Sequence, residues 1–260
     1  MADPVVSALW RYPVKSMQGE RLDHLEVGER VVEGDRVWGV VDAATGLLVS
    51  AKRDARLLEA FARTEAEGVV IRLPDGTEHL AADPATAGTL STWLDRDVVL
   101  RQPSGQAAYD MTLDPPNDGA EYYEIPTPPD TFLDLAAVHL LTTASVERCR
   151  EARPDIDWDI RRFRPNVLVD HDGDGFPEDE WVGRRVAVGQ VVIHGDMRTM
   201  RCAMPLRPQP AMAAVGSPAL RRETDVFRTM SAVHSNDLGL YASVVTPGRV
   251  ALGDPVAGLS

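Results

Sequence analysis

The stretch Arg198-Thr199-Met200-Arg201-Cys202-Ala203-Met204 places one of the chain's two cysteines shortly after an apolar run, residues 186–194, that is typical of a strand. A thiolate is a strong soft metal ligand and a nucleophile, and nearby arginines favour the charged form of a thiol. A cysteine can equally be a small buried hydrophobic residue. Cys202 is therefore the first candidate for chemistry, and the surrounding sequence must decide between these interpretations.

The composition is that of a soluble globular protein: 260 residues, 44% hydrophobic and 26% charged. This length suffices for one large domain or two closely packed smaller ones. The net charge of −13 argues against nucleic-acid binding, which needs clustered lysine and arginine. No apolar run is long enough to span a bilayer and no signal peptide is visible. We therefore expect a cytoplasmic protein without a membrane segment.

Short apolar runs punctuated by glycine and proline predict a mainly β fold with some α (α+β), built from barrel-like sheets. In the first part of the chain we expect strands at residues 5–12, 25–27, 38–42, 47–50, 69–73 and 98–101. Leu57, Leu58 and Phe61 would share one face of a short helix, and a second helix would begin at Pro84, capped by Asp83, and run to Asp95. These elements form an N-terminal β-barrel-like domain, residues 1–102.

Residues 103–130 are rich in proline and carboxylates, so we expect a connection with little regular structure. The second domain, residues 131–260, has predicted strands at 138–141, 167–169 and 186–194 and a helix at 144–153. Short helical pieces are expected at 218–222 and 226–234. Residues 241–245 and 249–252 would form a closing hairpin around Pro247-Gly248.

The start of the helix at 144–153 has two interpretations. Thr142, Thr143 and Ser145 surround it, and a hydroxyl before a helix is first of all a cap. A strand, hydroxyl groups and a helix N-terminus also make a natural phosphate site, because free backbone N–H groups point at the ligand. The segment 170–175 imitates the first half of a calcium loop, but Trp181 stands where the bidentate glutamate is needed, which indicates an acidic turn.

Several common sites are absent from the sequence. There is no dinucleotide-binding glycine motif, no P-loop, no H-E-x-x-H and no G-x-S-x-G. Two cysteines exclude four-cysteine metal sites, and the six histidines show no metal-ligand spacing. His194 or His234 could serve Cys202 as a base, so a cysteine-nucleophile enzyme stays open.

Five motifs in this order resemble the MOSC family, named for the C-terminal domain of molybdenum cofactor sulfurase, in the form with an N-terminal β-barrel domain. They are Tyr12-Pro13-Val14-Lys15-Ser16, Gly34-Asp35-Arg36-Val37-Trp38, Arg162-Phe163-Arg164-Pro165-Asn166, Glu178-Asp179-Glu180-Trp181-Val182-Gly183 and Arg201-Cys202. Relatives such as the mitochondrial amidoxime-reducing component hold a pyranopterin molybdenum cofactor through one cysteine. The resemblance implies a β-barrel-like MOSC domain packed against the N-terminal domain.

By this resemblance Cys202 is the molybdenum ligand and the catalytic residue. The cofactor would be held by residues that match the family's motif positions: Lys15, Ser16, Arg36, Thr142, Thr143, Ser145, Arg164, Asn166 and Arg201. Helix N–H groups, hydroxyls and guanidinium groups suit a phosphate-bearing anion. Two departures from the family stand out: Thr199 replaces a cysteine found in many relatives, and a proline-rich segment, residues 205–210, follows Cys202.

The resemblance implies an oxidoreductase that reduces N-oxygenated small molecules such as hydroxylamines or amidoximes. The sequence holds no electron-transfer module, so the electrons would come from a separate ferredoxin, flavoprotein or cytochrome-type protein. Two alternatives stay open: a molybdenum cofactor carrier or persulfide-forming sulfur-transfer module, and a pathway enzyme that uses Cys202 without molybdenum.

Overall fold

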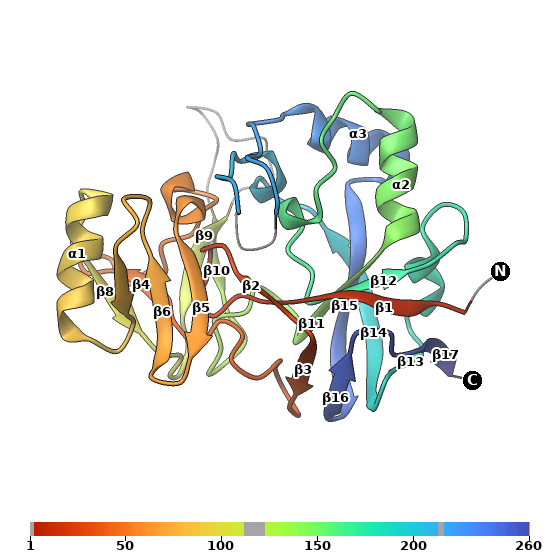
Figure 1. Cartoon of the computed structure of the whole chain (residues 1–260), viewed down its shortest axis with the longest axis horizontal. Helices are drawn as coiled ribbons and strands as arrows, with labels where there is room; N and C mark the ends of the chain where they lie inside the picture. The colour runs from red at the N-terminus through yellow and green to blue at the C-terminus, as the bar shows by residue number, and fades with distance from the viewer. Residues whose placement is uncertain (1–2, 112–122, 213–215, 260) are drawn as a thin grey trace.

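The computed structural model describes residues 3–111, 123–212 and 216–259, which form two lobes along the long axis of the molecule (Figure 1). One lobe contains the helix α1 (Pro84–Leu94) and several small sheets. The other contains the largest sheet and the helices α2 (Thr143–Ala152) and α3 (Asp225–His234). The predicted mainly β fold with some α is confirmed. No helix in the described part of the chain is long and apolar enough to cross a membrane.

The largest sheet has eight strands, and both halves of the chain contribute to it. Its order is β17 (Val256–Leu259), β13 (Arg185–Val188), β14 (Val191–Met200), β15 (Asp237–Thr246), β11 (Val138–Thr142), β12 (Val167–Asp170), β1 (Val5–Arg11) and β2 (Glu20–Leu22). Only β11 and β12 pair in parallel; the other neighbours are antiparallel. Because β1 pairs with β12, the N-terminal strand is part of the sheet that the C-terminal half of the chain builds.

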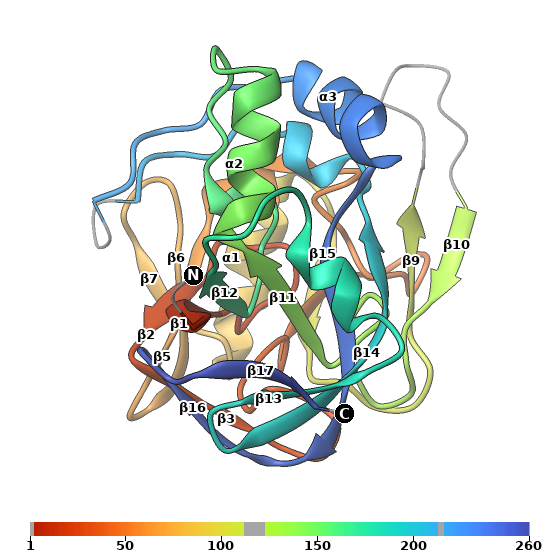
Figure 2. The same ribbon diagram turned by 90° about the vertical axis from the view of Figure 1, so that its right-hand side faces the viewer.

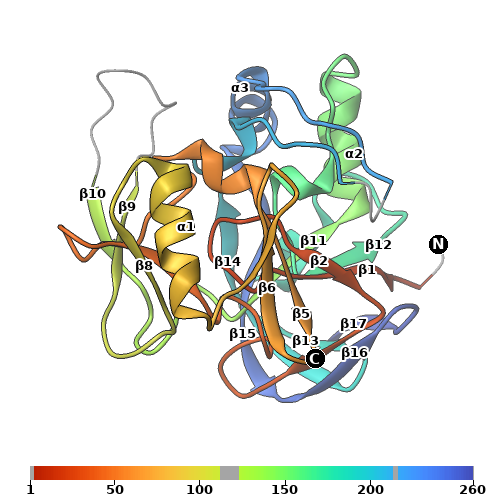
Figure 3. The ribbon, with the colours of Figure 1, turned by 60° about the vertical axis from the view of Figure 1, so that its left-hand side comes forward.

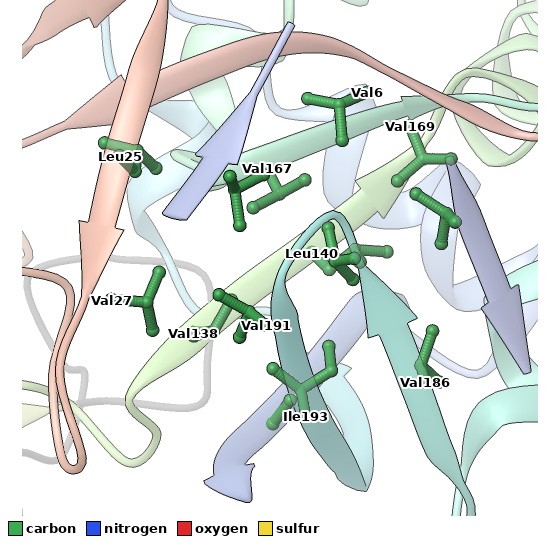
Figure 4. Close-up of a cluster of buried hydrophobic side chains, with 14 of the residues drawn as sticks. Val6, Leu25, Val27, Val138, Leu140, Val167, Val169, Val186, Val191 and Ile193 are labelled. Carbon is green, nitrogen blue, oxygen red and sulfur yellow. The ribbon is translucent and has the colours of Figure 1, made fainter. Parts of the chain in front are cut away.

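This half-barrel sheet surrounds a core of branched aliphatic side chains (Figure 4). Leu140, Val167 and Ile193 come from three different strands and are all buried. Branched side chains pack well on a pleated surface, which explains why valine-rich segments became these strands. The helices α2 and α3 lie side by side at one end of this lobe (Figure 2).

The remaining strands form small antiparallel sheets. They are β4 (Gly39–Asp42) with β8 (Val98–Arg101), β9 (Ala108–Met111) with β10 (Tyr123–Pro126), β3 (His24–Val27) with β16 (Gly248–Ala251), and β5 (Phe61–Glu65), β6 (Gly68–Arg72) and β7 (Glu78–Leu80). Short 3-10 helices are η1 (Ala55–Glu59), η2 (Ile160–Arg162), η3 (Pro177–Trp181) and η4 (Met204–Leu206). The helix α1 packs beside β8 (Figure 3), and the side chain of Asp83 caps it as predicted by accepting from the N–H of Ala85.

Two predictions about strands are wrong in an informative way. Residues 186–194 are two strands, because the chain reverses at Gly189, whose φ of +58° suits a tight turn, and β13 pairs back on β14. Residues 241–245 and 249–252 are not a hairpin. The strand β15 pairs with β14 and β11, whereas β16 pairs with β3 of the N-terminal half. Long-range pairing prevailed over the local turn signal.

Other predictions about secondary structure need smaller corrections. The helix predicted around Leu57 and Leu58 is the 3-10 helix η1, and Phe61 begins β5 instead. Residues 47–50 form no strand; Leu48 makes only isolated bridges. Residues 218–222 are not helical, while α3 matches the helix expected at 226–234. The connection 103–130 contains the strands β9 and β10, so it is more regular than expected. The proposed domain boundaries themselves stay a prediction.

Candidate functional site

A small cavity of about 60 Å³ lies where the two lobes meet, and both lobes line it. It brings together these predicted site residues: Lys15, Ser16, Arg36, Arg164, Asn166, Arg201 and Cys202. It also contains residues that the sequence analysis did not select: Ser50, Lys52, Asp134, His139 and Tyr241. Five cationic side chains therefore surround one cavity in a protein whose net charge is −13. Such a cavity suits an anion.

Cys202 lies two residues after the end of β14 and is half-buried in the cavity wall. It packs against the hydrophobic core of the N-terminal lobe although it belongs to the C-terminal half. The other cysteine, Cys149, is fully buried on α2, and burial raises the pKa of its thiol to about 12. The cavity therefore exposes one thiol to a ligand, while the interpretation of Cys149 as a core residue is supported.

Two arginines line the cavity close to Tyr12, the residue that follows β1. Arg36 and Arg164 both approach the ring of Tyr12, with guanidinium carbons 5.0 and 4.1 Å from its centroid. Their φ angles are +51° and +56°, and that of the adjacent Ser16 is +70°. Left-handed backbone is costly for residues other than glycine, and such strain clusters at functional sites. Arg164 is fixed further by a 2.7 Å hydrogen bond from Nη1 to the carbonyl of Met17.

Arg201 reaches the cavity from the residue before Cys202. Its Nη2 donates to the carbonyl of Phe163 at 2.8 Å, and its Nη1 lies 3.4 Å from Nε2 of His139. Burial, and then the charge of Arg201, lowers the pKa of His139 well below its ordinary value, so this histidine is neutral. Within the described residues, the buried Nε of Arg201 has no hydrogen-bond partner. A buried N–H without a partner is costly, so Arg201 is suited to an incoming acceptor.

Lys15 and Lys52 face each other across the carboxylate of Asp134. Their Nζ atoms lie 2.5 and 3.2 Å from its two oxygens, and both stand over the ring of Tyr109. Burial lowers the pKa of Lys15 to about 8, despite the opposing effect of Asp134. Burial would also lower the pKa of Lys52, but Asp134 and then Cys202 raise it above the ordinary value. The two ammonium groups in turn hold the pKa of Asp134 low against the effect of burial.

Sequence reasoning missed Lys52 and Asp134, although one signal was present. Of the 27 basic residues in the chain only two are lysines, and these are Lys15 and Lys52. Because all the other residues of this set are arginines, the two lysines stand out from composition alone. Asp134 carried no such signal, because it is one of 40 acidic residues.

Asn166 lines the cavity but is engaged mainly with the protein. Its side-chain oxygen accepts from the N–H of His139 at 3.1 Å, and its amide donates to the carbonyl of Trp10 and to Asp35. It therefore ties the strands β1 and β11 together beneath the arginines. Its contribution to a ligand would be through the position of its neighbours.

The predicted hydroxyl residues at the start of α2 lie outside the cavity. Thr142 and Ser145 are buried, and their hydroxyls lie 2.5 and 2.6 Å from Oε2 of Glu178. Thr143 donates to Asp170 at 3.0 Å and borders a different surface hollow beside α2. Thr142 also accepts from the N–H of Ser145 as the cap of α2. The hydroxyls that suggested a phosphate site are thus engaged by carboxylates of the same chain.

Comparison with protein families finds two matches that together cover most of the chain. The MOSC domain matches residues 129–257, and the MOSC N-terminal beta barrel domain matches residues 3–109. A comparison with curated protein sequences gives no significant match.

Two solved structures are among those similar to this chain. The YuaD protein of Bacillus subtilis has 11% identity and a TM-score of 0.48 over 98% of this chain and 94% of its own. YiiM of Escherichia coli has 15% identity and a TM-score of 0.33 over 61% of this chain and 64% of its own. With TM-scores below 0.5, these similarities add nothing to the family matches.

The cavity offers one thiol and several cationic hydrogen-bond donors. No group of three or more histidine, cysteine, aspartate or glutamate residues could hold a metal ion in the part of the chain that the structure describes. A metal that arrives within an anionic cofactor needs fewer protein ligands, and a thiolate is a suitable one. The open Nε of Arg201 and the cationic walls fit the phosphate of such a group.

Proposed function

Because the chain belongs to the MOSC family, in the form with an N-terminal β-barrel domain, we propose that it is a molybdenum-cofactor-binding oxidoreductase. MOSC domains are associated with molybdenum cofactor sulfurase-like proteins. The observation that carries the proposal is the convergence of five cations and the half-buried Cys202 on one cavity of an acidic protein. An anionic cofactor with a metal that accepts a thiolate satisfies both features.

In this proposal the residues of the chain bind and orient the cofactor. Arg36, Arg164 and Arg201 would hold its phosphate, since guanidinium groups match phosphate oxygens, and Ser16 would add a hydroxyl donor. Tyr12 and the carbonyls of Met17 and Phe163 keep the arginines in place beforehand. The cavity is small, so it would accommodate the phosphate end, while the rest of the cofactor extends toward the opening. Cys202 would ligate molybdenum.

The chemistry that the cofactor supplies when bound is a two-electron redox change at molybdenum. The proposed substrates are N-oxygenated compounds, whose N–O bond is cleaved with the oxygen leaving as water. Two electrons from a separate electron-transfer protein and two protons from solvent balance the reaction. Thr142, Thr143 and Ser145 have no place in this proposal, because Glu178 and Asp170 already engage their hydroxyls.

The test measures molybdenum and pterin in protein produced in a host that makes the cofactor. The parent should contain molybdenum and pterin in near-stoichiometric amounts. Cys202→Ala should lose the metal, and the matched control Cys149→Ala should retain it. Reduction of benzamidoxime with dithionite-reduced methyl viologen then tests activity. Bound cofactor without reduction would favour a carrier, and absence of both metal and pterin would refute the proposal.

A further inference from the structure

Lysine is rare in this chain, and its placement is specific. Both lysines, Lys15 and Lys52, line the cavity. Every other lysine or arginine position in the chain is an arginine, including the exposed Arg148 and Arg228. The two side chains are chemically different: an ammonium is a compact point charge with three donors, and a guanidinium is a planar fork. We call Arg36, Arg164 and Arg201 the arginine side of the cavity, suited to phosphate, and Lys15 and Lys52 its lysine side; Cys202 lines the same cavity.

The lysine side already binds an oxyanion from the protein itself. The carboxylate of Asp134 bridges the two Nζ atoms, and the ring of Tyr109 lies 4.5 Å from Lys15 and 4.2 Å from Lys52. Lys15 is the more engaged of the two, because it also donates to the carbonyl of Phe132 at 2.9 Å. Lys52 donates one hydrogen bond within the described residues, so an ammonium buried in the cavity wall keeps capacity for a ligand.

Carboxylates and exposed apolar side chains near the two lysines also affect what the cavity can bind. Against the five cations of the cavity stand Asp134 and, behind Arg36, the buried Asp35. A bound phosphate would neutralise part of this excess on the arginine side. Two exposed apolar side chains, Leu135 at 57% and Met200 at 54%, also line the cavity. A ligand next to Cys202 thus meets a cationic floor and apolar residues nearer to solvent.

From this geometry we infer that Lys52 is a substrate-binding residue that donates to the ligand oxygen beside Cys202. The site would prefer anionic or neutral N-oxygenated head groups on an apolar body to cationic ones. This inference rests on the proposed function for the identity of the substrate. The preference itself follows from charge, since a cationic head group would meet two ammonium groups that share the single carboxylate of Asp134.

The parent protein offers a test without substitution. Three probes carry the same phenyl body: benzohydroxamic acid, benzamidoxime and a phenyl-substituted N-hydroxyguanidine. At pH 6 the first two are neutral and the third is cationic. With the molybdenum-loaded protein and reduced methyl viologen, KM for the cationic probe should be about tenfold or more above that of either neutral probe. An equal or lower KM for the cationic probe would overturn the inference.

Substitution isolates Lys52. In Lys52→Met the KM for benzohydroxamic acid should rise about tenfold or more, as expected for a lost charge-assisted hydrogen bond, with molybdenum content unchanged. Lys52→Arg should recover part of this loss, and Arg228→Met, which removes an exposed charge, should change nothing. If Lys52→Met loses molybdenum and Lys52→Arg does too, Lys52 belongs to the cofactor site and the inference fails.

Calorimetric binding of benzohydroxamate separates this inference from the proposed function, because it needs no turnover. The Kd of the oxidised protein as isolated should be about tenfold higher or more in Lys52→Met than in the parent. Equal Kd values would refute the inference even if the protein is a reductase. A difference in Kd without any reductase activity would support Lys52 as an anion-binding residue and refute the proposed reaction alone.

Discussion

Two polar clusters in this protein have the sequence features of an anion site, but the fold uses them differently. At the cavity, side chains from both lobes converge and leave the Nε of Arg201 without a partner in the described residues. At the N-terminus of α2, Thr142 and Ser145 turn to the buried carboxylate of Glu178. The first cluster faces a cavity, whereas the hydroxyls of the second are engaged by a carboxylate of the same chain. Hydroxyls at a helix start therefore do not identify a ligand site until their partners are known.

The largest expected difference between the two clusters is in thiol reactivity. Cys202 lines the cavity, while Cys149 lies on α2 with its pKa raised to about 12 by burial and by Glu178. Since the thiolate is the reactive form, the cofactor-free folded protein should alkylate Cys202 at least about a thousandfold faster than Cys149 at pH 8. Mass spectrometry after iodoacetamide treatment measures both rates. In denaturant the two thiols should react alike, and similar rates in the folded protein would contradict the assignment.

Removing the donors at α2 should affect stability rather than cofactor binding. The double variant Thr142→Val with Ser145→Ala leaves Glu178 buried without either hydroxyl. We expect the free energy of unfolding to fall by about 2–4 kcal/mol, because two bonds to a buried acceptor are lost. Chemical denaturation gives this value, and molybdenum content should stay at the parent level. Loss of molybdenum from a stable variant would make α2 a ligand site after all.

Arg201→Met should weaken cofactor binding more than it lowers stability. The cavity loses a cation whose Nε is free of protein partners in the described structure, so cofactor affinity should fall about tenfold. Pterin retained after dialysis measures this loss. The variant loses the hydrogen bonds of the guanidinium to Phe163 and His139, so the unfolding free energy should fall by about 1–2 kcal/mol. Unchanged pterin retention would remove Arg201 from the site.

The smallest effect concerns the pH dependence of stability around Glu178. Burial raises the pKa of this carboxyl in the folded protein, against the opposing hydrogen bonds of Ser145 and Thr142. The folded state therefore binds its proton more tightly, and stability from this group declines as pH rises from the unfolded value of 4.5 to the higher folded one. Glu178→Gln lacks this decline, so the difference in unfolding free energy between the variant and the parent should change as pH rises above 4.5. Parallel curves of unfolding free energy against pH would exclude this effect.

Much of the fold and part of the site could be predicted from sequence. Apolar runs and the Asp83-Pro84 cap identified most strands and α1, because these signals are local. The hairpin expected at 241–252 does not form, because β16 pairs with β3, which is distant along the chain. Strand pairing is decided by the packing of whole sheets, and a turn signal cannot report it.

By itself the sequence determined the candidate chemistry: the motifs around Cys202, the matching arginines and the two lysines are all visible in it. Only the tertiary structure decided which polar groups meet. Asp134 lies 119 residues from Lys15 and 82 from Lys52, yet it bridges them, and Glu178 closes the helix start 36 residues after Thr142. Pairs this distant depend on how the lobes pack, because sequence spacing constrains distance only within one element.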